Sequence, residues 1–99
     1  MLFAVSYQLR PNASEESQGR ALQLFANWTP PQGYTFKAHY SYADCSGGLA
    51  LVETDSAAAA LEVHGAWVPF FEFKLVPLVE IEQAVKIGFG NVKWRQSVQ

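Results

Sequence analysis

Few residues of this chain could do chemistry, and two of them, His39 and Glu53, fall in runs that favour β-strands. An imidazole titrates near neutral pH, so His39 could remove a proton from an acidic carbon or orient an acidic ligand. Glu53, at the end of an apolar run, is the second candidate base. His39 and Glu53 are therefore the candidate catalytic residues. The plainer interpretations are a histidine hydrogen-bonded to a neighbour and a charge that protects a sheet edge.

Aromatic and polar side chains of this chain could together form the wall of a small cleft. Aromatic rings supply contact area in a ligand site, and a few polar groups fix the ligand's orientation. His64 and Trp67 are three residues apart, which places them on one side of a helix. The alternative is that these aromatic residues simply fill a core. The candidate ligand-binding residues are Tyr7, His39, Tyr40, Glu53, His64, Trp67 and Phe71.

Cys45 is the only cysteine, and it lies in a predicted turn next to Asp44. One thiol cannot form an intrachain disulfide, and zinc sites gather several Cys and His residues at short spacings. A catalytic thiol needs a neighbouring base, and His39 is several strand residues away. The sequence therefore predicts no metal site, no catalytic cysteine and a reducing, cytoplasmic location.

Charge and hydropathy argue against two classes of partner. Lys and Arg total 7 against 9 Asp and Glu, so the chain has no excess of basic residues to neutralise phosphates. No apolar run approaches the roughly 20 residues that a membrane-spanning helix needs. The first residues lack the basic leader of a signal peptide. We therefore expect a protein that binds neither nucleic acid nor membrane.

Hydrophobic periodicity predicts the elements that position these residues. Alternating apolar residues predict strands, and apolar residues three and four apart predict helices. Proline pairs and glycine clusters mark the ends of these elements. The predicted strands are Leu2–Leu9, Tyr34–Asp44, Leu49–Thr54 and Phe70–Val76, and the predicted helices are Ser14 to about Trp28, Ala57–His64 closing near Trp67, and Glu80–Ile87.

These elements describe one α+β domain over residues 1–99, with a core of about 1–87 and a loose C-terminal tail from 88 to 99. The order βαββαβ is the ferredoxin-like plan, in which two helices cover one face of a four-stranded antiparallel sheet. Charged residues make up only 16% of the chain, below the usual share, so we expect some apolar surface to stay uncovered in a single folded copy. We expect the bare sheet face to meet a second copy, giving a homodimer. The strand residues behind this expectation are Phe36, Tyr40, Tyr42, Leu49, Leu51, Phe71 and Phe73.

Four segments in order, Met1–Tyr7, Trp28–Gly33, Gly47–Asp55 and Val76–Glu80, resemble a small bacterial family known only as a domain of unknown function. The resemblance extends to about Val85. The members of this family look like dimeric α+β barrel proteins. That superfamily includes cofactor-free monooxygenases, haem-degrading enzymes, muconolactone isomerases and ligand-binding stress proteins. Haem-degrading members carry an asparagine in the first strand, where this chain has Ser6 and Gln8, so no cofactor is expected.

Three functions remain open at this point. The first is a homodimer that holds a small organic ligand in a cleft between sheet and helices. The second is a cofactor-independent monooxygenase or isomerase in which His39 or Glu53 removes a proton. The third is a structural or regulatory dimer with a filled barrel, for which no internal cavity is expected.

Overall fold

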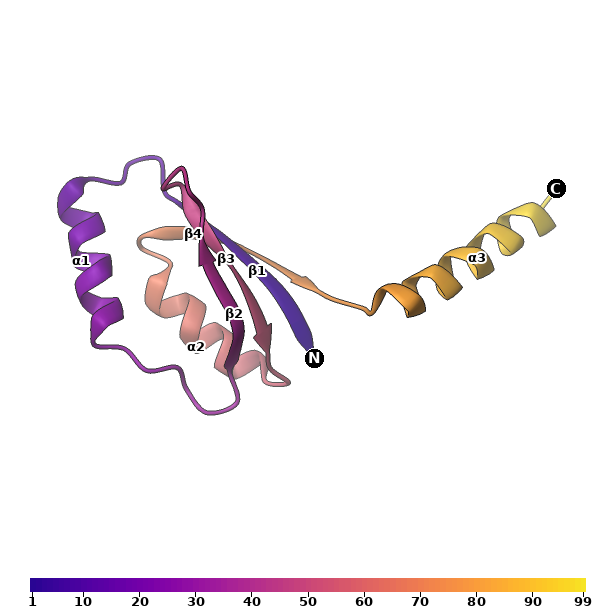
Figure 1. Ribbon diagram of the computed structural model, residues 1–99, viewed down its shortest axis with the longest axis horizontal. Coiled ribbons are helices and arrows are strands. Elements are labelled where there is room, and N and C mark those ends of the chain that lie inside the picture. Colours follow the sequence, from indigo (N-terminus) through magenta and orange to yellow (C-terminus); the bar gives the residue numbers. More distant parts are fainter.

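The computed structural model describes residues 1–99 and confirms the predicted order of strands and helices (Figure 1). Ser14 caps the first helix by accepting a hydrogen bond from the backbone N–H of Ser17, and Ser56 caps the second by accepting from Ala59. The elements are β1 (Leu2–Leu9), α1 (Glu15–Ala26), β2 (Thr35–Ser41), β3 (Gly47–Glu53), α2 (Ala57–Trp67), β4 (Phe71–Pro77) and α3 (Ile81–Ser97).

The four strands form one antiparallel sheet in the order β2-β3-β1-β4, as the ferredoxin-like plan requires. Val5 in the central strand β1 lies opposite Ala50 of β3 and Leu75 of β4. The core lies on the side of the sheet to which Val5 and Ala50 point, where they and the fully buried Val52 pack with residues of α2. Both α1 and α2 lie on that side in Figure 1, so the sheet has a helix face and an open face.

A β-bulge in β2 changes the predicted pattern of faces. Phe36 pairs with Val52, but the next paired residue is Ala38 with Leu51, so Lys37 is the extra residue. His39 then pairs with Ala50 and shares the helix face with Phe36. Strict alternation along the predicted strand Tyr34–Asp44 would place His39 and Phe36 on opposite faces, and the bulge between them places both on the helix face.

The open face is less aromatic than predicted. Strand pairing places Phe36, Phe71 and Phe73 on the helix face, against the prediction that they leave the bare face apolar. The residues that remain on the open face are Tyr40, Tyr42, Leu49, Leu51 and Val76 together with polar neighbours. Tyr40 is 66% exposed there.

Helix α1 is attached loosely to the sheet. Ala21 is its one buried residue, and the apolar Leu22 and Phe25 stay 72% and 50% exposed. Helix α2, in contrast, buries Ala59, Val63 and Trp67. Space is left between α1 and the sheet.

Helix α3 is longer than predicted and stands apart from the rest of the chain. It continues through Gly88 and Gly90 to Ser97, so the prediction of a helix ending at Ile87 with a loose tail is wrong. None of its residues is buried, and Figure 1 shows it projecting from the end of β4. The radius of gyration is consequently 17.7 Å, against about 13 Å for a compact chain of this length. None of the three helices has both the length and the apolarity needed to cross a membrane.

Candidate functional site

A cavity of about 490 Å³ lies between the helix face of the sheet and helices α1 and α2. This volume falls within the range of small-molecule sites. Fifteen of its 20 lining residues are hydrophobic, and none carries a charged side chain at neutral pH when histidine is neutral. The cavity can therefore bury an apolar molecule without leaving a charge unpaired.

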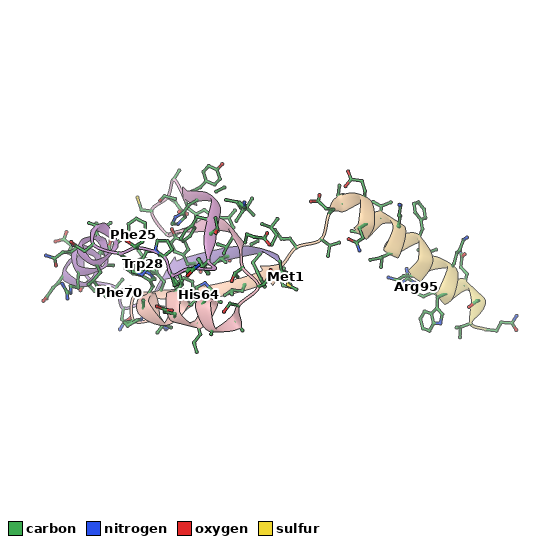
Figure 2. All side chains as sticks on the ribbon, turned by 90° about the horizontal axis from the view of Figure 1, so that it is seen from below. Met1, Phe25, Trp28, His64, Phe70 and Arg95 are labelled. Atoms are coloured by element: carbon green, nitrogen blue, oxygen red, sulfur yellow. The ribbon has the colours of Figure 1, made fainter.

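Two tyrosine–histidine pairs supply most of the polarity of the wall. The Tyr7 hydroxyl lies 2.7 Å from Nε2 of His39, which joins β1 to β2. The Tyr34 hydroxyl lies 3.0 Å from Nε2 of His64, which joins the segment before β2 to α2. Figure 2 labels His64 in the body of the protein, in the region of Phe25 and Trp28. Each pair thus ties together two elements that border the cavity.

The two pairs belong to a closed circuit of six aromatic rings. His39 stacks on Phe36 with ring centres 5.0 Å apart, and Phe36 meets Tyr34 at 5.4 Å. On the other side, His64 lies 5.0 Å from Phe73, which is 6.0 Å from Tyr7. All six rings line the cavity. We call this set, Tyr7, His39, Phe36, Tyr34, His64 and Phe73, the aromatic circuit.

A second group of rings lies toward α1 and α2. Trp28 and Trp67 meet edge to face with centres 5.6 Å apart, and Phe25 lies 5.9 Å from Trp67. Phe25 also lies 6.2 Å from His39, so it connects this group to the circuit. Edge-to-face and tilted contacts between these rings place large aromatic surfaces along the wall of the cavity.

Burial keeps the ionisable groups of the circuit neutral. It lowers the pKa of both His39 and His64 below the ordinary imidazole value and raises the pKa of Tyr34 to about 12. The pKa of Tyr7 is also raised, first by burial and then by the nearby Tyr42. At neutral pH the wall therefore presents uncharged imidazoles and phenols. A neutral imidazole can accept a proton from a bound molecule.

We expect the protein to lose stability as the pH falls below about 6.5, the ordinary imidazole pKa. The pKa of His64 is lower in the folded chain, so the unfolded chain binds protons first and is favoured in acid. This contribution is fully present above pH 6.5 and is lost as the pH falls through the folded pKa. Melting temperature measured from pH 8 to pH 5 reports the loss.

The variant His64→Gln keeps a hydrogen-bonding partner for Tyr34 and removes the titration. Its melting temperature is expected to vary less across this pH range than that of the original chain. Burial also lowers the pKa of His39, so His39→Gln should likewise reduce the dependence of the melting temperature on pH. Equal acid sensitivity in the original chain and His64→Gln contradicts this account.

The structure brings five of the seven candidate ligand residues to the cavity wall, namely Tyr7, His39, His64, Trp67 and Phe71. The other two lie elsewhere. Tyr40 points from the open face, because the residue next to His39 in a strand faces the opposite way. Glu53 is the last residue of the inner strand β3, where its carboxylate accepts a hydrogen bond from the Met1 amino group at 2.6 Å. Of the two candidate bases, His39 is thus the one that lines the cavity.

Sequence reasoning missed Tyr34, Phe36 and Phe73 as residues of the site. Tyr34 is 4% exposed and lies just before β2, where a strand pattern gives no guide to its direction. The direction of Phe36 could not be predicted because the bulge reverses it. Phe73 could be placed only from its alternation with Phe71. Cys45 lies at the exposed rim of the cavity, and no three metal-ligating side chains gather at one place.

Gly48 makes room for the Tyr7 ring. The two residues pair across β1 and β3, and a side-chain carbon at Gly48 would overlap the ring and hydroxyl of Tyr7. The same carbon would lie 2.6 Å from the backbone oxygen of Tyr40. A glycine at this position therefore allows Tyr7 to reach His39.

Comparison with known proteins gives a family and no activity. The model of the family described as Domain of unknown function (DUF3303) matches residues 1–91. No curated protein and no solved structure matches this chain.

Proposed function

Because this chain belongs to the DUF3303 family, whose name carries no activity, we propose its function from its own cavity: it is a homodimeric protein that binds a small organic molecule. The cavity between the sheet and helices α1 and α2 carries this proposal. Its apolar wall with a few neutral polar groups is the usual composition of a small-molecule site. The single, unpaired cysteine supports a cytoplasmic location.

The homodimer is proposed from two unpartnered surfaces. On the open face of the sheet, Leu49, Leu51 and the exposed Tyr40 and Val76 offer apolar area that a second sheet would cover to form a barrel. Helix α3 offers a second surface, the α3 stripe, formed by Ile81, Val85, Phe89 and Val92 at spacings of four, four and three residues.

Charge favours a second copy of this chain as the occupant of these surfaces. Helix α3 carries three basic residues against the single acidic Glu82, a net charge of +2. The whole chain carries −2, so the remainder carries −4. A positive arm and a negative body attract each other across two copies. A two-fold axis lets each arm meet the other body.

A second candidate function is a cofactor-independent monooxygenase or isomerase. The observation that favours it is the neutral His39 beside the Tyr7 hydroxyl on the cavity wall. In that reaction the imidazole accepts a proton from an acidic carbon of the bound molecule, and Tyr7 holds the ring in place. A structural or regulatory dimer with a filled barrel is the third candidate, and it leaves the cavity on the helix face, outside such a barrel, without a ligand.

We expect 1-naphthol to bind in the cavity, because it is flat, uncharged and mostly apolar. Isothermal titration calorimetry should give one site per chain with a negative heat-capacity change, the mark of apolar burial. The variant Ala50→Leu adds bulk to a lining residue that is 2% exposed and should weaken binding about tenfold or more.

Ala58→Leu is the matched control, since the same change falls on an exposed position of α2 outside the cavity. Its affinity for 1-naphthol should stay within about twofold of the original. No heat of binding in the original chain, or equal weakening by the two variants, would overturn the ligand-binding proposal.

A further inference from the structure

The two tyrosine–histidine pairs occupy opposite positions in the aromatic circuit. Phe36 separates them along one side of the circuit and Phe73 along the other. Each pair lines the cavity, so one bound molecule can meet both. The site therefore offers polar contact at two places and flat apolar contact between them.

Each pair can either donate or accept a hydrogen bond. When Tyr7 donates to Nε2 of His39, the phenol oxygen keeps lone pairs that accept from a ligand hydroxyl. When the imidazole carries its proton on Nε2 and donates to the phenol oxygen, the Tyr7 hydroxyl is free to donate to a ligand carbonyl. The same holds for Tyr34 and His64. A pair of this kind suits a ligand oxygen in either form.

Charge narrows the choice of ligand further. The lining residues include no Lys, Arg, Asp or Glu, so a carboxylate, sulfonate or ammonium group would be buried without a partner of opposite charge. Such burial is costly, whereas an uncharged hydroxyl or carbonyl is satisfied by one hydrogen bond. The rings of the circuit also favour a flat partner, since aromatic faces and edges pack best against another ring.

We propose that the ligand is an uncharged planar aromatic molecule bearing two oxygen atoms, hydroxyl or carbonyl, each hydrogen-bonded to one tyrosine–histidine pair. This inference rests on the proposed ligand-binding function of the cavity and adds the chemical class of the ligand. Tyr7 and Tyr34 are then the residues that determine specificity, because their hydroxyls contact the two oxygens.

The test compares three probes of one ring size by calorimetry: naphthalene, 1,5-dihydroxynaphthalene and naphthalene-1,5-disulfonate. The dihydroxy compound should bind about tenfold or more tighter than naphthalene, from two hydrogen bonds of ordinary strength. The disulfonate should bind more weakly than naphthalene. Tyr7→Phe and Tyr34→Phe should each lower the affinity for the dihydroxy compound and leave that for naphthalene within about twofold. Tyr40→Phe, on the open face, is the matched control and should change neither affinity.

The outcomes distinguish failure of the two-oxygen ligand from failure of the proposed ligand-binding function. If the dihydroxy compound binds no tighter than naphthalene, or if only one tyrosine variant weakens it, the two-oxygen ligand is wrong while the binding cavity stands. If 1-naphthol and all three probes fail to bind, the cavity proposal fails and takes this inference with it. Unchanged naphthalene binding in the tyrosine variants also shows that they fold.

Discussion

Replacing Trp67 by alanine is expected to destabilise the protein by about 3–5 kcal/mol, the usual cost of removing a large buried aromatic side chain. Trp67 is 9% exposed and belongs to the core cluster that joins α2 to the sheet. Its ring also meets Trp28 and Phe25, through which α1 is attached. A domain of this size is stable by only about 5–15 kcal/mol, so the variant should be partly unfolded at room temperature or close to it. Urea unfolding followed by circular dichroism measures the difference.

Trp94→Ala provides the matched control for this loss. Trp94 lies on α3, is 67% exposed and contributes nothing to the core. The same substitution there should change the unfolding free energy by no more than about 0.5 kcal/mol. Similar losses from the two variants would show that α3 is packed as firmly as α2, contrary to the arrangement described above.

The double substitution Val85→Glu and Phe89→Glu is expected to convert the proposed dimer to monomers at micromolar concentration. These residues form the middle of the α3 stripe, and both are exposed in the single chain. Burying an unpaired carboxylate in an apolar interface commonly costs several kcal/mol. Two carboxylates in their place should therefore weaken association by about 100-fold or more. Sedimentation velocity over a concentration series gives the dissociation constant.

The control carries the same added charge on the opposite side of α3. Gln83→Glu with Asn91→Glu adds two carboxylates away from the middle of the stripe, because each position is two and six residues from Val85 and Phe89 and so lies on the other face. This variant should remain a dimer with affinity within a few-fold of the original. A stripe variant that dimerises as tightly as the control would mean that α3 has no part in association. A monomeric original chain would remove the homodimer itself.

Most of the fold was predictable from the sequence because each element carries a local signal. The alternation in Leu2–Leu9, the serines that cap α1 and α2, and the glycines that begin β3 all lie within a few residues of the structure they determine. Strand order followed from the βαββαβ sequence of elements. The extent of α3 did not follow, because Gly88 and Gly90 favour a helix end and nothing local indicates that the helix continues.

The site was harder to predict because it depends on register and on distant contacts. The bulge at Lys37 reverses the facing of every residue before it, so no periodic reading could place Phe36 and His39 on one face. Tyr34 contacts His64, which is 30 residues away in the sequence, and no local pattern in one sequence indicates that contact. Glu53 was a reasonable candidate as a strand charge, but pairing with Leu2 and Thr35 places it at the end of the inner strand β3, away from the cavity.

The loose attachment of α1 has a kinetic consequence. A helix that buries only Ala21 can separate from the sheet at a small fraction of the global unfolding free energy. Opening of α1 widens the cavity while β1, β3 and α2 stay folded, so entry of the proposed ligand needs no global unfolding. For the proposed ligand, contacts with Phe25 and Trp28 favour the closed helix and so lengthen its residence.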